Sequence, residues 1–109
     1  MAAVILLASG CAHRMPAPAA WQWGLPVYPA SVMQGRTDAR ASVALYRTSD
    51  SFEDVDAWYL ASLPPGTAHA RNAEGKQATF ALFDERSRRT VHIQAEGTST
   101  VILLTRISP

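Results

Sequence analysis

The sequence predicts an α+β domain in which one helix packs on a four- or five-stranded, mainly antiparallel sheet. Residues 52–62 carry apolar side chains at helical spacing, and the segments after them alternate with a period of two. Short turns separate these later segments, as in antiparallel hairpins. The apolar stripe of the helix has to be buried, so we expect it to cover one face of the sheet.

The helix is predicted from its start, its stripe and its end. Asp50 and Glu53 form a capping-box-like pair, and Asp54 and Asp56 add negative charge near the helix N-terminus. Pro64-Pro65-Gly66 ends the helix, because proline cannot continue it. The apolar stripe consists of Phe52, Val55, Tyr59 and Leu63, with Trp58 on its flank.

Strands are predicted from alternation and β-type composition. The segments are 42–48, 67–72, 78–83, 91–95 and 100–107, of which 67–72 is the weakest. The last segment is apolar on both faces around Val101 to Leu104, so we expect it to be central. Residues 25–29 contain two prolines and are expected to enter the domain as an edge or a covering strap.

Composition and charge exclude several function classes. A chain of 109 residues fits one small domain, and its net charge of +1 gives no argument for nucleic-acid binding. The single cysteine permits neither an internal disulfide nor a cysteine-based metal cluster. We therefore expect no metal and no cofactor.

The residue pattern predicts no enzyme. His13, His69 and His92 share no metal-ligand spacing, and we interpret His69 and His92 as exposed strand residues. The acidic residues around the helix start are interpreted as partners of its dipole. Residues 84–89 read as a solvated hairpin loop, with lipid head groups or a protein partner as the alternative. A hydrolase built on His92 would need a neighbouring carboxylate in a concave pocket.

The N-terminal region is predicted to be a targeting signal rather than part of the folded domain. Residues 1–10 are an apolar run too short to span a bilayer and suited to a secretory signal. Residues 11–24 read as a linker after Cys11, and residues 25–109 as the single domain.

Ser9-Gly10-Cys11 resembles the lipobox of bacterial lipoproteins. The resemblance implies cleavage before Cys11, acylation of that cysteine and attachment to a membrane through the acyl groups. The protein would be exported and face the periplasm or the cell exterior. Because Ala12 is not the aspartate of an inner-membrane retention signal, the outer membrane is favoured in a cell with two membranes.

The domain itself resembles a loosely defined group of small bacterial envelope proteins. The matching residues are Tyr28-Pro29, Thr48-Ser49-Asp50-Ser51 and Trp58-Tyr59. These are structural signals, so the resemblance implies a fold and a location and carries no catalytic residue.

These observations together predict a non-enzymatic, lipid-anchored envelope protein that binds or assembles with another protein. The contact surface would be an open edge strand or the sheet face opposite the helix, with contributions from Tyr46, Thr79 and Ala81. The alternative is a small-ligand or glycan binder that uses Trp21 and Trp23, together with Trp58.

Overall fold

A six-stranded antiparallel sheet forms the body of the protein, in the order β4-β5-β9-β8-β7-β6. The computed structural model describes residues 16–38, 41–72, 74–85 and 87–108. The strands of the large sheet are β4 (Val32–Thr37), β5 (Ala41–Thr48), β6 (Ala68–Asn72), β7 (Gln77–Phe83), β8 (Arg88–Glu96) and β9 (Ser99–Ile107). A second, two-stranded sheet pairs β2 (Trp21–Gln22) with β3 (Leu25–Pro26), and the described helix is α2 (Phe52–Ser62).

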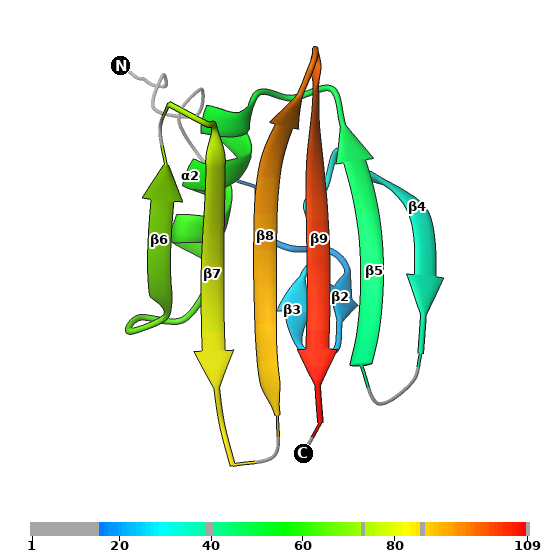
Figure 1. Ribbon diagram of the computed structural model, residues 1–109, viewed down its shortest axis with the longest axis vertical. Coiled ribbons are helices and arrows are strands. Elements are labelled where there is room, and N and C mark those ends of the chain that lie inside the picture. The colour runs from blue at the N-terminus through cyan, green and yellow to red at the C-terminus, as the bar shows by residue number, and fades with distance from the viewer. Residues whose placement is uncertain (1–15, 39–40, 73, 86, 109) are drawn as a thin grey trace, which may run out of the picture.

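The molecule has two layers. Helix α2 and the β2–β3 hairpin both lie behind the sheet in Figure 1, whereas no described element covers the front of it. The two faces are therefore unequal, and we call them the covered face and the open face.

Alternation along each strand builds the core against the covered face. Buried residues occupy alternate positions along β5, β7, β8 and β9, because successive residues of a strand point to opposite sides, and toward some strand ends the covered face is only half-buried. The helix and the segment after β3 supply the other half of the core. The largest fully buried side chains include Trp58, Tyr59, Phe80, Leu25, Ile93, Ile102 and Leu104.

The observed helix has the predicted range and the predicted apolar stripe, but its N-cap residue differs from the predicted one. Ser51, not Asp50, is the N-cap, and its Oγ accepts a hydrogen bond from the backbone N–H of Asp54 at 3.1 Å. Asp50 lies one position too early and instead accepts the hydroxyl of Tyr28 at 2.5 Å. At the other end, Leu63 has extended backbone angles and Pro64 follows, so the helix stops there.

The α+β class and the central place of β9 are confirmed, whereas the strand count is wrong. The described chain holds eight strands rather than four or five. Strand β4 was not predicted because all six of its residues are exposed, so buried and exposed residues do not alternate along it. Its register also shifts between Met33 and Gly35, which interrupts the period of two.

The N-terminal segment packs more closely than a free linker. Leu25 is completely buried, and the indole Nε1–H of Trp58 donates to the carbonyl of Pro16 at 2.7 Å. Contacts with the core thus reach back past residue 25, where we expected the domain to begin. The predicted signal and Cys11 lie outside the described residues.

Candidate binding site

The three tryptophans singled out from the sequence lie in three different environments. Trp58 is 1% exposed in the core, where its ring meets those of Tyr28 and Tyr59 edge-on. Trp21 lies on β2 with 58% of its surface exposed. Trp23 occupies the turn between β2 and β3 and is half-buried against the core. Of the three, Trp58 is unavailable to a ligand.

Trp23 lies at the centre of a group of arginines. The guanidinium carbons of Arg36 and Arg106 lie 5.8 and 5.6 Å from the centroid of its ring. Arg89 Nη1 donates to the Trp23 carbonyl at 3.3 Å. A cavity of about 560 Å³ opens here, and its described lining is Trp23, Asp84, Glu85, Ser87, Arg89 and Arg106.

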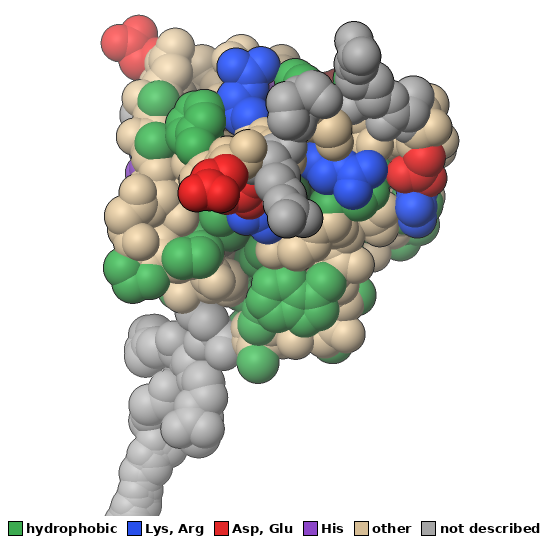
Figure 2. Space-filling view, turned by 90° about the horizontal axis from the view of Figure 1, so that it is seen from below, with side chains coloured by type: hydrophobic (Ala, Val, Ile, Leu, Met, Phe, Trp, Pro, Cys, Tyr) green, Lys and Arg blue, Asp and Glu red, His purple; other side chains and the backbone are tan. Residues whose placement is uncertain are grey.

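The loop between β7 and β8 forms the outer wall of this cavity. Asp84 folds the loop by accepting the backbone N–H of Ser87 at 2.8 Å, and Asp84 N–H donates to the Ser87 carbonyl at 3.1 Å. Figure 2 views the molecule from this end and shows basic and acidic side chains close together on its surface. The segment is more than a solvated loop, because it contributes to a concave site.

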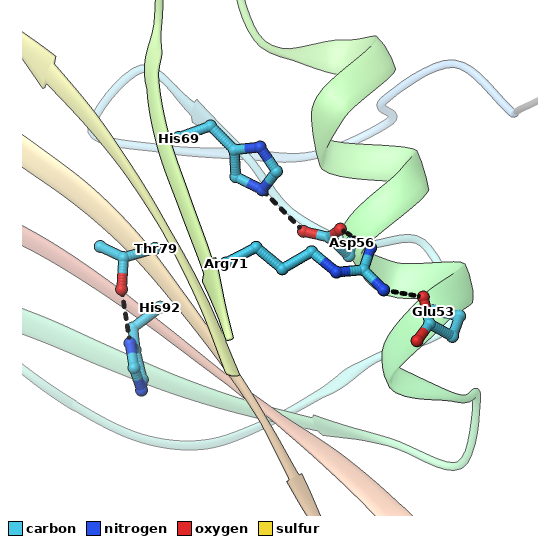
Figure 3. A network of polar contacts seen from close by, with 6 residues as sticks. All are labelled: Glu53, Asp56, His69, Arg71, Thr79 and His92. Atoms are coloured by element: carbon cyan, nitrogen blue, oxygen red, sulfur yellow. Dashed lines mark hydrogen bonds and ion pairs between the residues drawn. The ribbon is translucent and has the colours of Figure 1, made fainter. Parts of the chain in front are cut away.

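A second polar cluster ties the helix to strand β6 (Figure 3). Asp56 is buried, and its carboxylate accepts from Arg71 at 2.8 Å and lies 3.2 Å from His69 Nε2. Glu53 binds the same guanidinium at 2.5 Å, and this contact raises the pKa of Arg71. Asp56 is thus a buried partner for β6 rather than only a charge at the helix start.

His69 counts among the exposed residues of β6, as expected, but its side chain is partly covered. Its side chain is 23% exposed, and its ring stacks on Phe80 with 4.3 Å between centroids. His69 pairs with Phe80 across β6 and β7, which places it on the covered face. In an alanine-rich strand the alternation of residues does not predict which side of the strand the helix covers. The side on which His69 lies could therefore not be predicted from the sequence.

His92 is half-buried on the open face, and its Nδ1 lies 2.9 Å from the hydroxyl of Thr79 (Figure 3). His92 is thus partly buried and partnered by Thr79, rather than the exposed strand residue that we expected.

The open face carries an aliphatic stripe on the adjacent strands β5 and β9. Leu45 pairs directly with Leu103, while Val43 and Val101 lie two residues away on opposite sides of that pair, and all four are half-buried. Thr79 and Ala81 lie on this face, as the sequence suggested. Tyr46 does not, because it alternates onto the covered face, where it is 6% exposed.

The chain matches no family model, no curated protein and no solved structure. In the part of the chain that the structure describes, no helix is long and apolar enough to cross a bilayer. No three metal-ligating side chains come together among those same residues.

Proposed function

We propose that this protein is a non-enzymatic, lipid-anchored module of the bacterial cell envelope that binds another protein through its open sheet face. The observation that supports the proposal most directly is the aliphatic stripe of Val43, Leu45, Val101 and Leu103. An antiparallel sheet with one face in water normally alternates apolar and polar residues. Here β5 and β9 carry these four aliphatic side chains on the side that no described element covers, whereas the neighbouring strand β8 is polar on that side.

Several polar groups beside the stripe have partners within the sheet. Thr90 and Thr105 bind each other through their hydroxyls, and Thr79 binds His92. At one end Arg47 pairs with Glu96 at 2.8 Å. The stripe itself therefore offers aliphatic contact, and the partner that fits it presents aliphatic side chains of its own.

The anchor rests on the sequence of the first 24 residues. Acylation of Cys11 would hold the module at a membrane surface, since each buried methylene contributes about 0.8 kcal/mol. Mass spectrometry of the natively expressed protein tests this directly. We expect a mature chain that begins at acylated Cys11, and a Cys11→Ala variant without acyl groups. An intact, unlipidated N-terminus in the wild type would refute the lipid anchor. The proposal that the open face binds a protein would then be tested separately.

Site-specific photocrosslinking in native envelopes tests the face. A benzoylphenylalanine residue at Leu45 or Leu103 should yield the same discrete protein adduct. The same residue at Leu60, which is 59% exposed on α2, should yield none. Adding Leu45→Asp to the probe at Leu103 should remove the adduct. Equal adducts from Leu60, or an adduct only with a second copy of this chain, would contradict the proposed partner.

A small-ligand function is the second candidate, and one observation favours it for Trp23. The half-buried indole borders a cavity together with charged side chains. Trp21 lies on the neighbouring strand and is absent from the described lining of that cavity.

A further inference from the structure

The register of β8 and β9 brings two arginines together. Arg89 and Arg106 are direct cross-strand partners, and both alternate onto the covered face beside Trp23. Like charges directly opposite each other on a sheet are destabilising. A third arginine, Arg36, approaches the same indole from β4. The fold thus gathers three guanidinium groups at one end of the core, of which Arg36 is paired with Asp38 at 2.8 Å.

These two guanidinium groups are poorly satisfied within the protein. Arg106 donates from Nη2 to Ser42 Oγ at 3.2 Å and forms no ion pair with a described residue. Arg89 donates to the Trp23 carbonyl at 3.3 Å and reaches Asp84 at 3.5 Å, both long for a charged donor. The Nε–H of each arginine is buried, and neither has a hydrogen-bond partner among the described residues. A buried donor without a partner destabilises the folded protein, and more so when it is charged.

The backbone beside them is held in an unusual conformation. Trp23 has a φ of 53° and Gly24 a φ of 77°, which together make the tight two-residue turn of the hairpin. A bulky side chain rarely adopts positive φ, and such strain gathers at functional sites. A Cβ on Gly24 would lie 2.7 Å from Arg89 Nη1, so glycine also leaves room for that guanidinium.

We infer that the cavity beside Trp23 binds a phosphate group between Arg89 and Arg106. A carboxylate has two oxygens and matches one arginine fork, whereas a phosphate has enough oxygens for two. Asp84 and Glu85 line the same cavity, and their carboxylates favour hydrogen-bond donors of a ligand. The ligand class is therefore a phosphate ester that carries hydroxyl groups, either a soluble metabolite or a lipid head group.

Nuclear magnetic resonance of the ¹⁵N-labelled full chain carrying Cys11→Ala provides the first test. Titration with glycerol phosphate should shift the Nε–H signals of Arg89 and Arg106 and the indole signal of Trp23 along one saturable curve. The indole of Trp58, buried in the core, serves as the internal control and should not move. Acetate should bind at least about fivefold more weakly than glycerol phosphate. Signals that do not shift, or that shift equally with acetate, would overturn the inference.

Matched charge variants provide the second test. Arg106→Gln should weaken glycerol phosphate binding at least about tenfold, because it removes a charged donor from the site. Arg88→Gln removes the same charge from the neighbouring residue of β8, whose side chain alternates to the open face. It should change binding less than about twofold. Equal losses of glycerol phosphate affinity in the two variants would mean that the ligand is attracted only by the overall charge. That result would contradict a specific binding site.

A third test separates binding from structural support. Arg106→Met keeps an extended apolar stem while removing the unpaired buried donor. We expect it to abolish glycerol phosphate binding and to leave the unligated protein as stable as the wild type, or more stable. A large loss of stability without ligand would show that Arg106 serves the fold, and would overturn the inference.

Lipid vesicles identify the source of the phosphate. The Cys11→Ala chain is mixed with phosphatidylcholine vesicles with and without phosphatidylglycerol. Co-sedimentation that needs phosphatidylglycerol and is lost in Arg106→Gln assigns the site to a lipid head group. Binding of glycerol phosphate without such co-sedimentation assigns it to a soluble phosphate ester.

Discussion

Asp56 connects the helix to an edge strand through a carboxylate that is almost fully buried. Its side chain is 3% exposed, and it contacts both His69 and Arg71 of β6. Asp56→Asn removes the charge while keeping the size, and leaves Arg71 with one weaker acceptor. We expect the free energy of unfolding to fall by about 1–3 kcal/mol, measured by urea denaturation.

Glu53→Gln is the matched control, because Glu53 contacts the same guanidinium from an exposed position. Its side chain is 60% exposed, against 3% for Asp56. Solvent screens exposed ion pairs, so this substitution should cost about 0–1 kcal/mol. Equal costs for the two variants would mean that burial of Asp56 adds nothing to the tie between α2 and β6.

The tyrosines of the core make stability depend on alkaline pH. Burial raises the pKa of Tyr28, Tyr46 and Tyr59, and the hydrogen bond from Tyr28 to Asp50 adds to the shift. Above the ordinary tyrosine value of 10.0, the unfolded chain loses protons that the folded protein retains. The free energy of unfolding should therefore be independent of these groups below that value and fall as the pH rises past it.

Denaturation at a series of pH values measures this slope, and Tyr28→Phe isolates one contribution. Without the Tyr28 hydroxyl, the decline above pH 10.0 should be less steep. The variant also loses the bond to Asp50, so it should be less stable by about 0.5–1.5 kcal/mol at neutral pH. An unchanged alkaline slope would contradict a folded-state shift at Tyr28.

Helices and strands that have a clear pattern in their own residues could be predicted from the sequence. Strands that form only through pairing with a neighbouring strand could not. The helix from Phe52 to Ser62 follows from its stripe and its prolines, and the alternation of β7 and β8 follows from their apolar residues. Strand β4 buries no side chain, so its pairing with β5 left no periodic signal. Strands of two residues, as in the β2–β3 hairpin, are too short to show any period.

The β2–β3 turn tests how one glycine serves both the hairpin and the cavity. Gly24 and Gly66 have φ values of 77° and 87°, so alanine at either position should cost about 1 kcal/mol in thermal unfolding. Only at Gly24 does the added Cβ meet Arg89. Gly24→Ala alone should therefore shift the Arg89 Nε–H signal and weaken glycerol phosphate binding. Weakened binding in Gly66→Ala as well would point to general destabilisation.

At the scale of the whole molecule, the candidate site arises from register. Trp23 stood out in the sequence as an aromatic residue near the start of the domain, but Arg89 and Arg106 did not. They become neighbours only because β8 pairs with β9 so that these two positions face each other. The open face depends in the same way on which side of the sheet the helix covers. Neither the pairing of the two arginines nor the identity of the open face could be predicted from the composition.

Two adjacent residues of β9 test whether the open face serves binding rather than folding. Leu104 is completely buried on the covered face, and Leu103 is half-buried on the open face. Leu104→Ala should lower the free energy of unfolding by about 2–5 kcal/mol, because it leaves a cavity in the core. Leu103→Thr should cost less than about 1.5 kcal/mol, since threonine suits a strand and little buried surface is lost.

Partner binding should follow the opposite order. Leu103→Thr places a hydroxyl in the middle of the aliphatic stripe, and the protein captured by the crosslinking probe at Leu45 should no longer be captured. Leu104→Ala, assayed at a temperature where it is folded, should still capture it, because Leu104 does not reach that face. If Leu103→Thr keeps the partner while it destabilises the fold as much as Leu104→Ala, the stripe belongs to the stability of the sheet. The open face would then have no role in recognition.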